Sequence, residues 1–414
     1  MMDNEYTKRR IAVIGGGPAG MMAAGTAILY GADVTIFEHM KYLGKKLGIT
    51  GKGRCNVTNN CTVNDFLENV PRNPRFLYSA LGAFPPERTI EFFEELGVSL
   101  KTERGNRVFP TDDKAKTIVD AMRKYCRDAK VIYEKVRSVK PKDDGSFTVT
   151  AETERIFDAV IIATGGRSYP LTGSDGSGYR LASSLGHSVT ELRPSLIPIE
   201  SSSKICAEMM GLSLKNVAIK ILDRSDRTLY TDFGEMMFTH FGVTGPMILS
   251  ASAHVRDADI SSLTLSIDLK PALDEQTLDA RLLSDFKKNA NRDLRNSLGG
   301  LLPSKMIEPL IELSGISPYK KINLITKDER RAILSLLKDF RIPLSKLRPI
   351  EEAIITSGGI NVKEINPKTM ESKLTGGIFF AGEIIDVDAY TGGFNLQIAY
   401  ATGYIAGKSA AESY

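Results

Sequence analysis

The residues most able to do chemistry form a glycine-rich turn, Gly15-Gly-Gly-Pro-Ala-Gly20, directly after the apolar run IAVI. In such a turn the first glycine permits a tight bend, and the second lets the backbone approach a pyrophosphate. The last lets the next helix pack closely on the strand. The free N–H groups at the start of that helix and the positive end of its dipole then face the pyrophosphate. The pattern therefore predicts a dinucleotide site, with contacts from Gly15, Gly17, Pro18, Ala19 and Gly20.

Glu38 ends the next apolar run, ADVTIFE, at a position where a carboxylate can hold a ribose diol by hydrogen bonds. A G-x-G-x-x-G pattern alone is weak evidence, because glycine-rich turns also occur without a ligand. Here the pattern follows a predicted strand, opens a predicted helix and precedes a second strand that ends in an acid. That context favours a dinucleotide site over a glycine turn with an incidental acid.

Two later segments favour FAD over NAD as the dinucleotide. A buried strand ends in Ala-Thr-Gly at 163–165, and a strand near the C-terminus ends in Phe-Ala-Gly-Glu at 380–383. A glycine pair then opens the last helix, whose N–H groups would face the flavin N1/C2=O edge, where negative charge develops on reduction. The expected FAD contacts in these segments are Ala163, Thr164, Gly165, Gly382, Glu383, Gly393, Phe394, Asn395 and Leu396.

A longer set of motifs points to a family. The segment 48–59, GITGKGRCNVTN, is not a motif common to Rossmann-type domains. It resembles the signature of the BaiN-like flavoproteins, also called the aminoacetone oxidase family of FAD-binding enzymes. Five further segments are similar to motifs of that family: GEMMFTHFGVTGP, TSGGI, KTMESK, AGEIIDVD and, after the last of these, TGGFNLQIA. The resemblance extends from Ile11 to the last helix, which is nearly the whole chain.

The resemblance implies that Lys46 and the step Arg54-Cys55-Asn56 lie along the cofactor, and Val136 is placed with them. Gly51 and Gly53 free the backbone around Arg54, whose guanidinium would contact phosphate or flavin. The alternative is a structural turn with a surface arginine. For Cys55 we expect a small residue packed at the cofactor, because a redox thiol would need a resolving cysteine at short spacing.

Candidate catalytic groups are His240, Tyr390 and Asn395. His240 lies in the glycine-flanked run FTHFGVTGP, and a histidine is a residue type suited to proton transfer beside a flavin. The alternative is a histidine that only fixes its loop by hydrogen bonds. Tyr390 and Asn395, like Tyr169, are expected near the flavin face as donors or stacking groups. Asp386 and Asp388 are expected to be solvated or to cap the loop.

Hydrophobic periodicity and turn residues predict the elements that position these groups. A βαβ unit is expected at 10–38, amphipathic helices at 85–97 and 112–126, and alternating strands at 216–222 and 262–269. Charged helices follow within 274–340, with helix-start residues at Asp274 and Pro303 and a stop at Gly315.

The fold class is α/β. We expect a two-motif, discontinuous Rossmann-type FAD-binding domain at 1–193 and 350–414. It carries an inserted β-rich substrate domain at 194–273 and 341–349, and a small helical domain at 274–340. The resemblance implies the same three parts.

Composition and charge limit the partners. The hydrophobic fraction of 42% and charged fraction of 25% are ordinary for a soluble protein, and 54 basic against 50 acidic residues give a net charge of only +4. We therefore expect a small-molecule substrate and no nucleic-acid partner. Without an apolar run for a membrane span or signal peptide, we expect a cytoplasmic protein with no membrane partner. Four scattered cysteines and four histidines predict no metal site, and the oligomeric state stays open.

The resemblance implies an FAD-dependent oxidoreductase that reduces an activated C=C bond, in a 3-oxo bile-acid or enone-like substrate, by hydride transfer from the flavin. NAD(P)H would bind transiently as electron donor, because the sequence has no second G-x-G-x-x-G. The alternative is an oxidase of small amines such as aminoacetone, which passes electrons to O2 and forms H2O2. A non-enzymatic FAD-dependent or RNA-associated protein is a third reading, to which the weak net charge gives little support.

Overall fold

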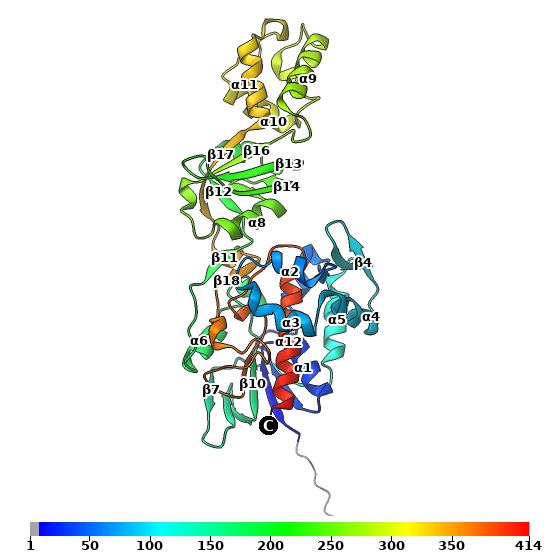
Figure 1. The fold of residues 1–414 in the computed structure, drawn as a ribbon, viewed down its shortest axis with the longest axis vertical. Helices are drawn as coiled ribbons and strands as arrows, with labels where there is room; N and C mark the ends of the chain where they lie inside the picture. The colour runs from blue at the N-terminus through cyan, green and yellow to red at the C-terminus, as the bar shows by residue number, and fades with distance from the viewer. Residues whose placement is uncertain (1–7, 414) are drawn as a thin grey trace, which may run out of the picture. The chain divides into compact units, whose positions relative to one another are not determined.

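The computed structural model describes residues 8–413 and separates into two units (Figure 1). The first unit comprises Met1–Ser195 and Ile350–Tyr414, and the second is Leu196–Pro349. Residues 1–7 and residue 414 lie outside the described part of the chain. The α/β fold class is confirmed, whereas the division of the inserted segment into two domains stays a prediction.

A parallel five-stranded sheet is the centre of the first unit. Its strand order is β19-β10-β1-β2-β6. The bounds are β1 Arg10–Ile14, β2 Asp33–Phe37, β6 Lys130–Ile132, β10 Ala159–Ile162 and β19 Ile378–Phe380. β1 lies between β2 and β10, with Val13 opposite both Ile36 and Ile161. Near-continuous apolar runs in these strands fit a parallel sheet covered on both faces.

Helices α1 (Pro18–Leu29) and α12 (Phe394–Glu412) come from opposite ends of the chain and pack side by side (Figure 1). Their close approach depends on glycines of α12. A Cβ on Gly403 would lie 2.5 Å from the Ala19 carbonyl oxygen, and one on Gly407 would lie 2.3 Å from that of Ala23. The small-residue sequence of α12 therefore fixes how near it sits to α1.

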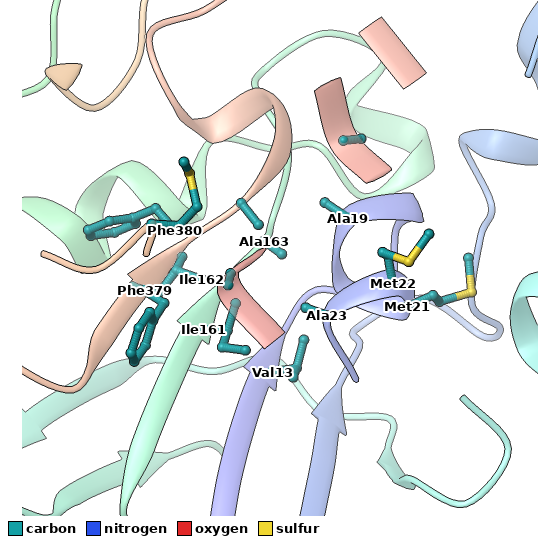
Figure 2. Close-up of a cluster of buried hydrophobic side chains, with 14 of the residues drawn as sticks. Val13, Ala19, Met21, Met22, Ala23, Ile161, Ile162, Ala163, Phe379 and Phe380 are labelled. Carbon is teal, nitrogen blue, oxygen red and sulfur yellow. The ribbon is translucent and has the colours of Figure 1, made fainter. Parts of the chain in front are cut away.

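The core beside this helix pair is drawn in Figure 2. Val13 on β1, Ile161 and Ile162 on β10, and Phe379 and Phe380 on β19 are all fully or almost fully buried. Met21, Met22 and Ala23 of α1 belong to the same cluster, together with Ala19 and Ala163. Because α1 is covered on several sides, it carries no polar face.

The remaining elements of the first unit surround this sheet. The strands are β3 Thr58–Asn59, β4 Leu100–Glu103, β5 Arg107–Pro110, β7 Ser138–Pro141, β8 Phe147–Thr150, β9 Glu154–Phe157, β11 Arg193–Ser195 and β18 Ile355–Ser357. The helices are α2 Val63–Glu68, α3 Tyr78–Ala83, α4 Pro86–Glu95, α5 Ala115–Tyr125 and α6 Ser177–Ser184. β3-β5-β4 and β7-β8-β9 form three-stranded sheets, and β11 pairs with β18.

The second unit combines a closed barrel with three longer helices. The barrel order is β12-β15-β14-β13-β16-β17. The bounds are β12 Ile199–Ser201, β13 Ser213–Leu222, β14 Thr228–Phe238, β15 Gly242–Thr244, β16 Thr264–Asp268, β17 Phe340–Leu347, α7 Ile205–Glu208 and α8 Pro246–Val255. Between β16 and β17 come α9 Glu275–Lys288, α10 Ser304–Ser314 and α11 Lys327–Lys338 (Figure 1). Asp274 and Pro303 lie directly before α9 and α10 and Gly315 directly after α10, as predicted.

The predicted βαβ unit, the amphipathic helices and the alternating strands are all present at their expected positions. Across residues 8–413, no helix combines the length and the apolar character that crossing a membrane requires.

Candidate functional site

The glycine turn between β1 and α1 leads directly into the N-terminus of α1. Gly15 has a φ of +107°, and a Cβ there would lie 2.4 Å from the Ala163 carbonyl oxygen, so the turn holds β1 against the end of β10. A Cβ on Gly20 would lie 1.9 Å from the Gly15 oxygen. In contrast, a Cβ on Gly17 would meet no atom of residues 8–413 within 4 Å, and no side chain of these residues caps the helix there. The first N–H groups of α1 therefore remain available to a phosphate.

Glu38 is held in place at the end of β2. Its carboxylate accepts from the backbone N–H of Gly16 at 2.9 Å and from that of Met40 at 2.8 Å. These two bonds aim the carboxylate beside the glycine turn, as a ribose contact requires. They would equally brace the turn without a ligand, so the ribose role stays a prediction. Val136, after β6, is buried in the core of the first unit, and its contact with the cofactor also stays a prediction.

Two expected cofactor residues from distant segments meet in an ion pair. Lys46 donates to the Glu383 carboxylate at 2.9 Å and to the Ser168 hydroxyl at 2.8 Å. The second carboxylate oxygen of Glu383 accepts from the backbone N–H of Thr356 at 2.8 Å. A Cβ on neighbouring Gly382 would lie 2.7 Å from the Ala19 side chain, so this C-terminal motif touches the first turn of α1. The structure thus brings both predicted halves of the site together.

Three buried polar atoms near these motifs have no hydrogen-bond partner among the described residues. They are the Thr164 hydroxyl, the Tyr179 hydroxyl and the Asn56 amide oxygen. Tyr179 is only 6% exposed, and burial followed by the charges of Glu383 and Asp386 raises its pKa above the usual range. Buried polar groups without a partner are uncommon and fit a site that a polar ligand completes. The sequence motifs predicted Thr164 and Asn56 as cofactor contacts, but no motif pointed to Tyr179.

Arg54 and Cys55 differ in how well they match the expected cofactor contact. The Arg54 guanidinium binds the carboxylates of Glu103 and Asp113 and lies 4.2 Å from the centre of the Phe109 ring. Its phosphate or flavin contact stays a prediction, because the structure assigns the guanidinium to two acids. Cys55 is fully buried, and burial raises its thiol pKa to about 12. A protonated, buried thiol fits the expected packing residue and not a redox group.

The last helix begins as the sequence predicts, at a glycine whose neighbours leave no room for a side chain. Gly393 precedes α12 with a φ of +98°, and a Cβ there would lie 2.4 Å from the Thr58 carbonyl oxygen. No side chain of the described residues caps this helix, and its first turn contains no acid, so its N–H groups are open to a ligand. Phe394 is buried against Phe66, and Leu396 packs on the same core.

Gln397 anchors the start of α12, a role that sequence reasoning missed. Its side chain is fully buried, accepts from the Thr58 hydroxyl at 2.7 Å and the Thr89 hydroxyl at 2.6 Å, and donates to the Phe84 carbonyl at 2.8 Å. The sequence does place this glutamine in a mostly apolar helix. That position could have predicted a buried amide with hydrogen-bond partners, because buried polar groups are hydrogen-bonded.

Asn395 braces the loop that precedes α12. Its amide oxygen accepts from the Ala389 N–H at 2.9 Å, and its amide nitrogen donates to the Ala389 carbonyl at 2.7 Å and the Tyr390 carbonyl at 3.3 Å. Tyr390 itself donates its backbone N–H to the Asn69 carbonyl at 3.0 Å. The geometry makes Asn395 a positioning residue, and direct catalytic roles for Asn395 and Tyr390 stay predictions.

Asp386 and Asp388 were expected to be solvated or to cap the loop, and solvation is wrong, because both side chains are buried. Asp386 is 3% exposed and binds the Arg72 guanidinium, while Asp388 is fully buried and accepts from the hydroxyls of Ser195 and Ser357, each at 2.9 Å. Buried carboxylates are stable only with such partners, which come from segments far away in the sequence.

His240 lies between β14 and β15 in the second unit, with an exposed side chain beside Phe241. The cofactor motifs belong to the first unit, so its catalytic role stays a prediction. Tyr169, in the first unit, is 37% exposed.

Comparison with known proteins identifies the family. The sequence profile of the family described as "HI0933-like protein Rossmann domain" matches residues 9–409. The chain belongs to the HI0933-like family.

Relatives with curated names match almost the whole of this HI0933-like chain. A 3-dehydro-bile acid delta(4,6)-reductase of Clostridium scindens is 31% identical, over 97% of this chain and 99% of the relative. A ribosomal RNA dihydrouridine synthase of Escherichia coli is 29% identical, over 95% of each chain. The structure of 3-ketosteroid-delta4-(5alpha)-dehydrogenase from Rhodococcus jostii is similar with a TM-score of 0.54 and 14% identity, covering 99% of each chain, and shows the fold alone.

These matches confirm the family that the motifs indicated and the Rossmann-type FAD-binding fold. This HI0933-like chain is an FAD-dependent oxidoreductase. The open N-termini of α1 and α12 and the unpartnered polar atoms fit FAD as its cofactor.

Proposed function

We propose that this oxidoreductase saturates a carbon–carbon double bond conjugated with a carbonyl group, with NADH or NADPH as electron donor. One observation carries the proposal: relatives that match nearly the whole chain are named after two reductions of this type. In a 3-oxo compound with delta(4,6) double bonds, and in the uracil ring of uridine, the double bond is conjugated with a carbonyl. Hydride addition at the β-carbon and protonation at the α-carbon would serve both substrates.

The residues of the first unit divide the task of holding FAD. The N-terminus of α1 and Glu38 would bind its adenosine diphosphate part, Lys46 and Glu383 its central chain, and the N-terminus of α12 its ring. Bound FAD would supply the hydride-transfer chemistry between the nicotinamide and the β-carbon of the substrate. The chain's own residues must then exclude water from the ring, orient the carbonyl and deliver one proton to the α-carbon.

The proton donor belongs among groups that keep an available proton near neutrality. His240 and Tyr390 remain candidates, whereas the Asn395 amide is committed to the loop at Ala389. The balanced reaction consumes the double bond, one NAD(P)H and one proton, and it yields the saturated product and NAD(P)+.

We propose an enone-like small molecule as the first substrate class, following the C. scindens relative at 31% identity. A uridine in RNA is the second candidate. The E. coli relative favours it, and so does a concentration of positive charge in the second unit, described below.

The test is anaerobic mixing of the FAD-loaded protein with NADH or NADPH while the visible flavin absorbance is recorded. We expect bleaching by at least one donor and recovery of the absorbance when a 3-oxo-delta4 steroid or a uridine-containing RNA is added. Mass spectrometry should find a product two hydrogens heavier. Failure of both donors to bleach the flavin would overturn the proposal. Peroxide formation from aminoacetone and O2 without a nicotinamide would support an amine oxidase instead.

A further inference from the structure

The positive charge of the chain is concentrated in two short segments of the second unit. Positions 287–296 and 318–324 contain six basic residues and one acid, whereas the whole chain has a net charge of +4. These segments therefore carry more than the entire net positive charge, and the rest of the chain is slightly negative. Such local asymmetry is a typical electrostatic feature of a nucleic-acid contact.

The two segments lie against each other in the structure. Leu294 donates its backbone N–H to the Lys320 carbonyl at 2.9 Å, and Ile322 donates to the Arg292 carbonyl at 3.0 Å. Leu294 and Ile322 are buried, while Arg292 and Arg295 are exposed. These two backbone hydrogen bonds hold the two segments together, so the spacing of their exposed side chains does not depend on a bound partner.

We call this surface the Arg295 face and define it by Lys287, Lys288, Arg292, Arg295 and Tyr319. Lys287 and Lys288 end α9, which with α10 and α11 follows β16 and precedes β17 in the chain (Figure 1). The guanidinium of Arg295 lies 4.4 Å from the centre of the Tyr319 ring, and Tyr319 is 64% exposed. An exposed aromatic ring beside cations is the combination that stacks on unpaired bases and neutralises phosphates.

The carboxylates beside this surface are already engaged. Asp293 pairs with Lys321 at 2.8 Å, and Glu329 pairs with Lys320 at 2.6 Å. No ion pair to a described residue engages the four cations of the Arg295 face. Lys287 and Lys288 have a structural explanation, because cations stabilise a helix C-terminus, but Arg292 and Arg295 lie beyond the helix.

We propose that the Arg295 face is a docking surface for RNA. The cations bind backbone phosphates, and Tyr319 with Arg295 stacks on an unpaired base. As a route to an RNA substrate, the inference rests on the second candidate of the proposed function; as a binding surface, it stands on the geometry alone. It changes the expectation drawn from net charge, since a small total hides a concentrated local excess.

The test measures binding of a fluorescein-labelled, uridine-containing RNA hairpin to the full-length, FAD-loaded protein by fluorescence anisotropy over a range of salt concentrations. In the double variant Arg292→Gln with Arg295→Gln, the slope of log Kd against log salt should fall by about one for each cation removed. The affinity should fall at least about tenfold, since phosphate contacts dominate binding to nucleic acids.

Two variants separate charge from stacking. Tyr319→Ala should weaken binding on the order of tenfold without changing the salt slope, because base–aromatic stacking does not release counterions. Arg295→Lys should keep the slope while losing part of the affinity, because lysine lacks the planar group that stacks. The matched control is Lys215→Gln with Lys220→Gln, the same charge change at exposed positions of β13.

The inference is overturned if the arginine double variant and the β13 control bind RNA equally. It is also overturned if the face binds vesicles of anionic lipid while the protein has no affinity for RNA. Bleaching of the flavin by NADPH and reduction of a steroid enone are recorded for the same proteins. Enone reduction without RNA affinity would remove this inference alone, and RNA binding through the face without any C=C reduction would remove the proposed reaction alone.

Discussion

Lys46 and Glu383 stand far apart in the sequence and form an ion pair of 2.9 Å in which both side chains are mostly buried. Glu383 also accepts from Ser168 and from the Thr356 backbone, so its carboxylate ties together four segments of the first unit. The pair therefore joins the N-terminal and C-terminal parts of the FAD site into one structure.

Replacing one partner of this pair should weaken both the fold and FAD binding. Lys46→Met leaves the carboxylate without its cation and should lower the free energy of unfolding by about 1–3 kcal/mol. Glu383→Gln keeps the acceptor shape and should cost less. Urea unfolding of the FAD-free protein and FAD titration measure the two effects. If Lys46→Met changes neither quantity, the pair has no structural role in the site.

Gly17 and Gly20 should respond to the same added methyl group in opposite ways. A Cβ on Gly17 would meet no atom of the described part of the chain within 4 Å, and its φ of −77° is allowed for alanine, so Gly17→Ala should fold with an unchanged Tm. It should nevertheless raise the Kd for FAD about tenfold or more, because the methyl occupies the path of the pyrophosphate.

Gly20→Ala is the matched control, because it adds the same methyl group at a position where the group would collide with the protein itself. Its Cβ would lie 1.9 Å from the Gly15 carbonyl oxygen, so we expect a loss of about 1–3 kcal/mol of stability even without FAD. A destabilised Gly17→Ala protein, or a Gly17→Ala protein with normal FAD affinity, would contradict the assignment of the α1 N-terminus to the pyrophosphate.

Cys55 should be inert as a thiol. Burial raises its pKa to about 12, and its side chain is fully inaccessible, so iodoacetamide should not label it in the native protein at neutral pH. Cys55→Ala should retain NAD(P)H-dependent bleaching of the flavin within about threefold, since only packing is lost. Labelling of Cys55 in the native state, or inactivation by this substitution, would indicate a chemical role instead.

Asn395 should act on FAD through the loop it braces. Asn395→Leu removes two good hydrogen bonds to Ala389, each contributing about 1 kcal/mol, so the Kd for FAD should rise on the order of tenfold. Asn395→Asp keeps only the acceptor and should show an intermediate effect. If FAD affinity is normal and only turnover falls, Asn395 touches the substrate, and the positioning role is wrong.

The parts of the site that the sequence predicted are those built from contiguous residues. The glycine turn, the strand end at Ala163 and the glycine start of α12 each depend on a few neighbouring positions whose conformation is set locally. The fold class followed from the same patterns, because a βαβ unit and alternating strands have distinct hydrophobic periods.

The unpredicted parts depend on contacts between distant segments. Gln397 forms hydrogen bonds with Thr58 and Thr89, and Arg54 forms ion pairs with Glu103 and Asp113. These partners come together only in the folded chain. Asp386 and Asp388 alternate with apolar residues in the loop, and partners from distant segments make the burial of their carboxylates possible.

His187 gives the first unit a pH dependence whose direction follows from its burial. The side chain is fully inaccessible between Glu364 and Ser372, and burial lowers its pKa from 6.5 although the Glu364 charge opposes that shift. The folded protein then binds fewer protons than the unfolded chain, so stability from this group is complete above pH 6.5 and is lost as the pH falls through the lowered value. Each unit of that shift corresponds to about 1.4 kcal/mol. Urea unfolding at neutral and mildly acidic pH should show the loss, and His187→Gln should flatten it between those values; a variant with the wild-type slope would assign the pH dependence to another group.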